Sequence, residues 1–436
     1  MTRLREPIWG LAIAAILVVL LEIGRVESGR RDYAWLIAEA AVAGAALVLA
    51  WRRQEQLRLL PLLILAAGYH VALVWGHIAA DIPVDFDISI FTNQGQSLLD
   101  GDYPRSEYPT GAVSLFALET WLGDESARTP NALLMIPCQL AAVAAIWSLR
   151  TRWSAWLAAL VALWPLDLYA WEFKFDLVPA ALLAVGLALA YRERFGLAGI
   201  VLGVGAAVKW TPALAALALL AWLLASRRVR EGVRHSAGFV VAFGALTIPY
   251  LAWEADDVLA AYDIQGGRTI TGESLPYLPL HWLGQAELGE DFTHAAVVPD
   301  WADPAVTIVQ LLLLAGVLVV AWLARGRLAA GVAVAAVAPV VFLLTNRIFS
   351  SQFLVVLIVA WAVAIALLAR SRREQLLLGA AAAAASLLNA FVYPYNLPGP
   401  SGIWEPVSAL MFAVALPLTG WLLLTAARGR DYASPS

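Results

Sequence analysis

The chain has 436 residues, of which 61% are hydrophobic and 14% are charged. This is too little polar material to cover a soluble globule of that size, so the composition excludes a soluble domain and predicts a polytopic membrane protein. The formal net charge is -4 and the basic residues stand in short scattered groups, which excludes a nucleic-acid-binding face. The single cysteine, Cys138, excludes an internal disulfide.

Twelve apolar runs of roughly bilayer length predict membrane-spanning helices. They cover residues 7–24, 33–50, 59–80, 129–149, 153–171, 175–191, 236–252, 305–324, 329–345, 352–369, 376–392 and 405–426. No small-residue cleavage site follows the first run, so we interpret it as a retained span. We expect an all-α, polytopic transmembrane helix bundle of about 12 to 14 membrane segments, forming a single domain over residues 1–436.

Short arginine-rich joints separate many of these runs. They contain Arg52, Arg53 and Arg58; Arg150 and Arg152; Arg192 and Arg194; Arg227, Arg228, Arg230 and Arg234; Arg325 and Arg327; Arg370, Arg372 and Arg373; and Arg428 and Arg430. The positive-inside rule places these joints and the N-terminus in the cytoplasm, and the acidic joints 81–110 and 253–304 outside. The joint 25–32 carries three arginines on the outer side, against the rule.

Two segments do not fit a single crossing. Residues 196–225 are apolar throughout except for Lys209, yet arginines at both flanks favour the cytoplasm. Both flanks can remain in the cytoplasm if the segment forms two short antiparallel helices joined by a turn at residues 209–212. That turn would lie in a water-filled cavity open to the outside. Residues 110–122 are also expected to form a re-entrant or interfacial helix. If they crossed the membrane, the acidic joint 81–110 and the joint with Arg150 and Arg152 could not lie on the sides that the positive-inside rule gives them.

The acidic stretch 81–111 contains the first candidate site residues. Asp85 and Asp87 are two residues apart, so on a helix only one of them can face a given cavity. Asp87 precedes a stretch, 88–99, that could form an interfacial helix, and it serves there either as a cap or as a general base. Tyr103 and Tyr108 each precede a proline, which is typical of turns and, alternatively, of aromatic rings that stack on sugars.

The only two lysines, Lys174 and Lys209, both fall at predicted outer ends of spans. Positive charge is disfavoured there, so each lysine either extends to the interface or binds an anion such as a phosphate. The helix-breaking sequence around Lys209 favours the phosphate. For Lys174 the simplest alternative is a structural ion pair with Asp176.

The loop around Arg268 and Glu273 and the residue Arg347 add further outer charges. Each arginine is either a salt-bridge partner or a phosphate clamp. The histidines lack metal spacing, because His70 and His77 share one helix face without a third ligand, so we expect no metal and no cofactor.

These residues resemble landmarks of a known family. The first outer loop, with Asp87, Phe91, Gly101, Tyr103, Pro104, Tyr108 and Pro109, is similar to that of glycosyltransferase family 87. Later landmarks follow in the same order: Phe175, Asp176 and Pro179; Gly203, Lys209 and Pro212; Glu273 and Ser274; and Arg347, Phe349, Ser350 and Gln352. The likeness covers roughly residues 60 to 400. Departures at Tyr103, Thr110 and Ser351 bear on the substrate rather than on the reaction type.

The resemblance implies a membrane glycosyltransferase of the GT-C type that transfers a sugar, with mannose expected, from a polyprenyl-phosphate donor with inversion. Asp87 would be the general base, and no metal would be required. Substrate-binding residues would be Asp85, Tyr103, Tyr108, Lys174, Lys209, Arg268, Glu273, Arg347 and Gln352. The active-site loops would be 81–111, 171–176, 209–212, 253–304 and 346–352. The partners would be the donor, a lipid or glycan acceptor and membrane lipids, and the enzyme would lie in the cell membrane with its site facing outside.

Two other functions fit parts of the pattern. A transporter or flippase of lipid-linked sugars also uses broken helices, but it favours internal repeats and charges near the bilayer midplane. The chain has no clear internal repeat, and its ionisable residues gather at one predicted face. A non-catalytic partner in a cell-envelope complex is the third interpretation, and it requires Asp87 to lie away from the cavity.

Overall fold

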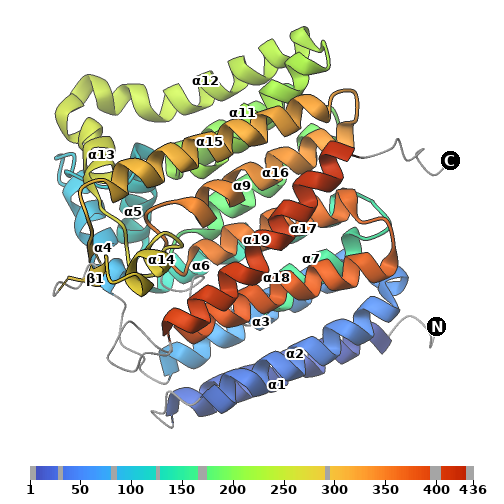
Figure 1. Cartoon of the computed structure of the whole chain (residues 1–436). Helices are drawn as coiled ribbons and strands as arrows, with labels where there is room; N and C mark the ends of the chain where they lie inside the picture. The colour runs from blue at the N-terminus through green and yellow to red at the C-terminus, as the bar shows by residue number, and fades with distance from the viewer. Residues whose placement is uncertain are drawn as a thin grey trace.

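A computed structural model describes residues 6–27, 33–79, 86–123, 128–164, 174–289, 295–392 and 404–428. The fold is all-α, as predicted, and most helices run side by side in one bundle (Figure 1). The helices of the first half are α1 (Glu6–Glu27), α2 (Tyr33–Arg52), η2 (Gln54–Gln56), α3 (Leu59–Ala79), α4 (Phe86–Leu99), α5 (Thr110–Leu122), α6 (Arg128–Ser148), α7 (Ser154–Leu163), α9 (Leu177–Tyr191), α10 (Phe195–Val208) and α11 (Thr211–Ala225). Those of the second half are α12 (Val229–Trp253), α13 (Ala255–Gly267), α14 (Tyr277–Trp282), α15 (Ala302–Leu323), α16 (Leu328–Thr345), α17 (Phe353–Leu368), α18 (Arg372–Val392) and α19 (Trp404–Arg428). One two-stranded ribbon pairs β1 (Glu287–Leu288) with β2 (Ala296–Val297).

Nine of the described helices are long and apolar enough to cross a membrane. They are α1, α2, α3, α6, α12, α15, α16, α18 and α19. The predicted runs 153–171, 175–191 and 352–369 correspond to the shorter apolar helices α7, α9 and α17. The fold class is therefore the predicted one. Among the described residues, nine helices meet the length and composition criterion for crossing a membrane.

The predicted break in the long apolar segment is present. Helix α10 ends at Val208, Lys209 is extended with φ -155° and ψ 137°, and α11 begins at Thr211. Pro212 lies in the first turn of α11, where its missing N–H leaves no bond unmade and where it prevents α10 from continuing. Residues 110–122 form the separate helix α5, and its predicted re-entrant or interfacial position in the membrane stays a prediction.

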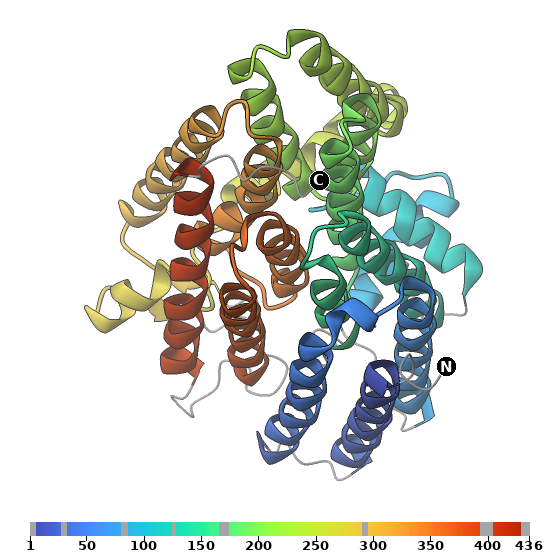
Figure 2. The ribbon, with the colours of Figure 1, turned by 90° about the vertical axis from the view of Figure 1, so that its right-hand side faces the viewer.

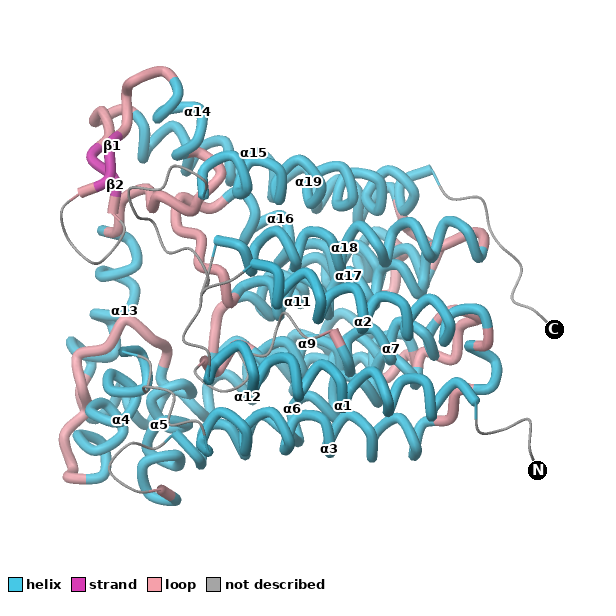
Figure 3. Tube along the Cα trace, turned by 90° about the horizontal axis from the view of Figure 1, so that it is seen from below, coloured by secondary structure: helices cyan, strands magenta, loops and turns pink. Residues whose placement is uncertain are grey.

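The joints divide between two ends of the bundle. Helices α4, α5, α13 and α14 and the ribbon lie at one end, and the start of α1 and the end of α19 lie at the other (Figure 3). Figure 2 looks at this second end. There the arginine-rich joints contact each other: Arg372 donates to the carbonyls of Trp51 and Arg52, 3.0 and 2.7 Å away, and Arg327 to that of Ala427, 3.1 Å away. We call this the arginine end.

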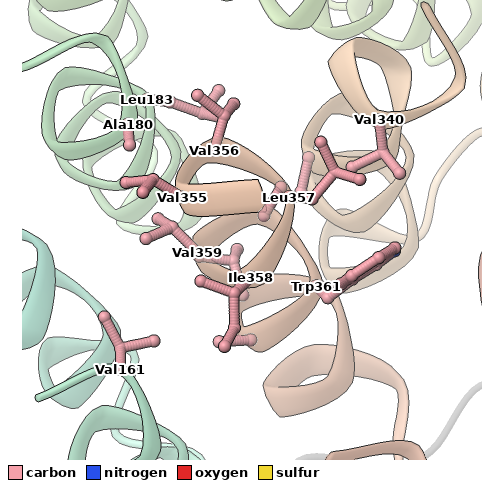
Figure 4. Packing of buried hydrophobic residues seen from close by; sticks show 14 of the residues in the cluster. Val161, Ala180, Leu183, Val340, Val355, Val356, Leu357, Ile358, Val359 and Trp361 are labelled. Atoms are coloured by element: carbon pink, nitrogen blue, oxygen red, sulfur yellow. The ribbon is translucent and has the colours of Figure 1, made fainter. Parts of the chain in front are cut away.

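Helix α17 lies at the centre of the bundle. Its residues from Phe353 to Ala366 are all buried, because an uninterrupted apolar sequence suits a helix surrounded on every side. Figure 4 shows that Val356 of α17 lies beside Leu183 of α9, and that Leu357 of α17 points the other way, toward Val340 of α16. Since α17 begins at Phe353, this rigid helix fixes the first residues after the loop 346–352.

Candidate functional site

The predicted site residues that the structure describes lie mainly at the end opposite the arginine end. Close packing brings the Tyr108 turn to the helix break there. An added Cβ at Gly111 would lie 2.6 Å from the carbonyl oxygen of Ala207, so only glycine allows α5 to begin against the end of α10. Thr110 also bonds Thr247 of α12, with the two hydroxyl oxygens 3.2 Å apart. The turn before α5 is therefore anchored beside Lys209.

Four charged residues form two ion pairs. Lys174 donates to Asp87, which lies in the first turn of α4, and Lys209 donates to Asp176 over 2.5 Å. Asp176 is 1% exposed and Lys174 is 5% exposed at the side chain, whereas Asp87 is 25% exposed and therefore reachable. The interpretation that Lys174 pairs with Asp176 is wrong: each lysine crosses to another segment. We call Asp87, Lys174, Asp176 and Lys209 the charged row.

Two rings hold the ammonium group of Lys209 in place. Its nitrogen lies 5.1 Å from the ring centre of Phe175 and 4.7 Å from that of Phe353. Such cation–π contacts, added to the ion pair with buried Asp176, fix the lysine inside the protein. Lys209 therefore does not reach out to the membrane interface.

Tyr108 lies inside a cluster of aromatic rings. Its ring meets those of Phe91, Phe116 and Phe175 edge to face, at centre distances of 5.4 to 5.7 Å. Loss of solvent, followed by the neighbouring carboxylates of Glu107 and Asp87, raises the pKa of the Tyr108 hydroxyl well above its usual range. The hydroxyl therefore stays protonated between the carboxylate of Asp87 in the charged row and that of Glu107, which belongs to a second cluster.

The second cluster joins Glu107 to the end of α13. Arg268 donates to the Glu107 carboxylate over 2.9 Å, and Gln265 reaches the same carboxylate at 3.4 Å. Arg347 donates to the carbonyls of Gly266 and Gln265, 2.5 and 3.3 Å away, and so caps the C-terminus of α13. Arg268 is thus a salt-bridge partner and Arg347 a helix cap, and both stand beside the same loop.

Glu273 lies near this cluster, in the loop before α14. Burial raises the pKa of its carboxyl to about 7, although the Arg268 guanidinium opposes the shift. A carboxyl with that pKa can both accept and release a proton near neutral pH.

The remaining predicted residues have different surroundings. Tyr103 is 5% exposed and packs with Val113, Val258 and Tyr250, so its ring belongs to a small core under α13. Gln352 precedes the first residue of α17 without a side-chain capping bond. Asp85 lies outside the described residues.

Several residues that shape the site are not among the catalytic and substrate-binding residues that the sequence predicted. Glu107 and Asp176 supply the carboxylates for Arg268 and Lys209, and Phe353 covers Lys209. The stacked pair of Trp210 and Tyr262, with ring centres 5.1 Å apart, joins the helix break to α13. Glu107 and Asp176 stand beside Tyr108 and Lys174 in the sequence, but only the fold shows which charge each one meets.

The geometry suits chemistry on an anionic, hydroxyl-bearing substrate. The partly exposed carboxylate of Asp87 lies beside the ammonium group of Lys174, and a carboxylate in that position can accept a proton. The ammonium group of Lys209 and the guanidinium of Arg268, each paired with another carboxylate, are groups that can stabilise a leaving phosphate. Among the described residues no group of three or more His, Cys, Asp or Glu side chains is arranged to hold a metal ion.

Comparison with known families gives one match. A family model of glycosyltransferase family 87 matches residues 107–346, which is more than half of the chain, and this confirms the resemblance seen in the sequence. The matched span includes Glu107, Tyr108, Lys174, Lys209 and Arg268, whereas Asp87 precedes it. No curated protein and no solved structure matches the chain.

Proposed function

This chain belongs to glycosyltransferase family 87 and is a membrane glycosyltransferase, and on that premise we propose that it uses a polyprenyl-phosphate-linked donor. The sugar we propose is mannose, and the acceptor is a lipid or a glycan. The site faces the extracytoplasmic side of the cell membrane, and the whole chain acts as one domain. Family membership favours this enzyme over a transporter or flippase.

The observation that carries the proposal is the position of Asp87 in the charged row. Its carboxylate is 25% exposed, lies at the first turn of a helix that does not span the membrane, and stands next to Lys174. Lys209, paired with Asp176, and Arg268, paired with Glu107, are two further cations. When a hydroxyl displaces a phosphate, a base must take the hydroxyl proton and cations must stabilise the leaving phosphate.

The reaction proceeds by a single displacement. The acceptor hydroxyl oxygen forms a bond to the anomeric carbon while the bond from that carbon to the phosphate oxygen breaks. Asp87 takes the hydroxyl proton, and the phosphate leaves with the bonding electron pair as polyprenyl phosphate. Attack from the face opposite the leaving group inverts the anomeric carbon. Lys174, Lys209 and Arg268 stabilise the charge that gathers on the phosphate.

The test is transfer of labelled sugar from polyprenyl-phosphate donors by the purified protein. Asp87→Asn is expected to lower kcat about 10²-fold to 10⁴-fold, because a general base contributes on that scale. The matched control is Asp100→Asn, since Asp100 is an exposed carboxylate of the same stretch that bonds only to Gln96 among the described residues. A folded Asp87→Asn variant that transfers at the wild-type rate removes Asp87 from the mechanism, and absence of transfer by the wild type from any such donor rejects the donor class.

A further inference from the structure

The segment between α13 and α15 carries two exposed apolar side chains at the end of α14. Trp282 is 62% exposed and Leu283 is 71% exposed, whereas Tyr277, Leu278 and Leu280 before them are buried. We call Trp282 and Leu283 the α14 tip. Neither residue belongs to the charged row, and the reaction steps above do not use them.

Backbone hydrogen bonds hold the chain reversal that follows the tip. Gly284 has φ +69°, the left-handed conformation that glycine commonly adopts where a helix ends. Its N–H donates to the carbonyl of His281 over 2.9 Å, and the N–H of Gln285 donates to that of Leu280 over 2.8 Å. These two bonds form a Schellman motif, so the helix stops directly after Leu283. The exposed polar residue Gln285 follows at once, which confines the apolar surface to the tip.

Three contacts tie this segment to the first turns of two helices that are long and apolar enough to cross a membrane. Thr269 donates its hydroxyl to the Asp303 carboxylate of α15 over 2.8 Å, and the N–H of Ile270 donates to the same carboxylate over 3.1 Å. On the other side, Nε2 of His281 lies 3.2 Å from the Glu405 carboxylate of α19. His281 directly precedes the tip, so the tip lies at the level where α15 and α19 begin.

The tryptophans at the two ends of α15 mark the membrane boundary. Trp301 directly precedes α15 and Trp322 lies in its last turn, and both are exposed. At the helical rise per residue they are about 32 Å apart, which matches a hydrocarbon core about 30 Å thick. Exposed tryptophans concentrate at the two membrane–water interfaces. The first turn of α15, and with it the α14 tip, therefore lies at one of these interfaces.

Two views show that α14 projects sideways from the bundle. In Figure 3, α14 lies at the edge of the molecule, beyond α15 and α19. In Figure 2, which looks at the arginine end, the yellow segment that contains α14 extends past the red α19. Of the candidate span in α15, 17% is buried, so lipid covers most of that helix. A segment that projects past α15 at the membrane boundary therefore meets lipid.

We propose that the α14 tip inserts into the membrane leaflet at the end of the bundle opposite the arginine end. It lies there between the headgroups and the acyl chains, and its partner is membrane lipid rather than a protein. Tryptophan suits that boundary, because its ring is apolar while its indole N–H can bond a headgroup or water. The inference requires only that the chain is embedded in a membrane, and it does not depend on the proposed function.

Insertion of the tip has a consequence for the second cluster. The same segment carries Arg268 and Glu273, and the N–H of Thr271 donates to the carbonyl of Arg347 over 2.9 Å. Two ties at the first turns of α15 and α19, together with the tip in lipid, hold this segment at the membrane surface. The second cluster is thereby kept at a fixed height above the leaflet.

The experiment measures the depth of the tip with a fluorescent label. Leu283→Cys in a Cys138→Ala background is labelled with bimane, and the whole chain is placed in nanodiscs that hold one copy each. Phospholipids with a spin label near the headgroup are expected to quench this label more than phospholipids labelled near the chain end, and aqueous iodide is expected to quench it little. Gln285→Cys, exposed and two residues away, is the matched control, and iodide rather than lipid should quench it.

Two further variants keep the result interpretable. Leu312→Cys, at an exposed position in the middle of α15, should be quenched most by the label near the chain end, which calibrates the depth. Trp282→Cys should repeat the result of Leu283→Cys, so the test survives if one variant fails to fold. Quenching of both tip variants by iodide as strongly as that of Gln285→Cys would place the tip in water and overturn the proposal. Protection of both from lipid and iodide alike would show that protein covers the tip, and it would overturn the proposal as well.

Discussion

Lys209 holds a structural ion pair, and we propose that it also binds the donor phosphate. Its ammonium group neutralises Asp176, whose side chain is 1% exposed. Lys209→Gln alone leaves that carboxylate buried without its cation, which costs about 3 to 5 kcal/mol of stability. The variant is therefore expected to lower the melting temperature as well as the affinity for the donor.

A double variant separates these two roles. Asp176→Asn with Lys209→Gln removes both charges, so its melting temperature is expected to return toward that of the wild type. Donor KM is expected to stay raised about tenfold, because the phosphate still lacks a cation. Thermal unfolding and transfer kinetics on the three proteins check this prediction, and wild-type donor KM in the double variant would make Lys209 purely structural.

Glu273 gives the protein a titration near neutral pH. Because burial raises its pKa from 4.5 to about 7, the folded state binds more protons than the unfolded state between these values. The free energy of unfolding is therefore expected to fall as the pH rises from 4.5 to 7. Above pH 7, ionisation of Glu273 lowers it no further. Glu273→Gln removes this dependence, so its melting temperature, relative to the wild type, rises from pH 4.5 to 7. Exposed Glu254→Gln is the control, and parallel curves for wild type and Glu273→Gln would contradict the assignment.

At the level of single residues, sequence reasoning found most of the charges but not their partners. The two lysines stood out because positive charge is unusual at an outer joint, and both lie in the charged row. Asp87 meets Lys174 across a separation of 87 residues, and no local pattern encodes that distance. Tyr103 resembled Tyr108 in sequence, yet one ring lies in a small core and the other beside the charged row.

At the level of elements, the contact between α5 and α10 positions the site. Gly111→Ala places a methyl group 2.6 Å from the backbone of Ala207, so α5 must shift and move Tyr108 away from the helix break. We expect a loss of about 1 to 3 kcal/mol in stability and a larger fall in kcat than in donor affinity. Gly68→Ala, with open space around its Cβ, is the control. Unchanged kcat in a folded Gly111→Ala variant would show that this contact does not position the site.

The helix break was predictable from charge parity together with proline chemistry. Arginines at both flanks demanded an even number of crossings, and Pro212 fixed where the turn could occur. The position of the break along the bundle could not be predicted, because it depends on how α10 packs against α5 and α12. Glycines set that packing, and their role is visible only with both partners in place.

At the level of the whole molecule, the two ends of the bundle predict its orientation. The arginine end is expected to lie in the cytoplasm and the end with α4, α13 and α14 outside. In a Cys138→Ala background, Gln285→Cys should react with a membrane-impermeant maleimide on intact cells. Glu55→Cys, exposed at the arginine end, should react only after permeabilisation. The reverse pattern would place the charged row on the cytoplasmic side.

The fold class followed from composition alone, because a chain this apolar must bury its backbone polar groups in helices. The number of crossings did not follow as directly. Helices α7, α9 and α17 are shorter than their apolar runs suggested, since buried helices need not match the thickness of the bilayer. Hydrophobicity predicts burial, and it does not distinguish burial in protein from burial in lipid.

The bonds at the arginine end give three of its arginines a role beyond their charge. Arg372 and Arg327 reach the last carbonyls of α2 and α19, and Arg192 reaches the Ser148 carbonyl at the end of α6, 2.9 Å away. Lysine would supply the same charge for orientation, but it lacks the planar guanidinium that in Arg372 donates to two carbonyls while its central carbon lies 5.3 Å from the ring centre of Trp51. At these three joints arginine therefore does more than set topology, because it binds the end of a neighbouring helix.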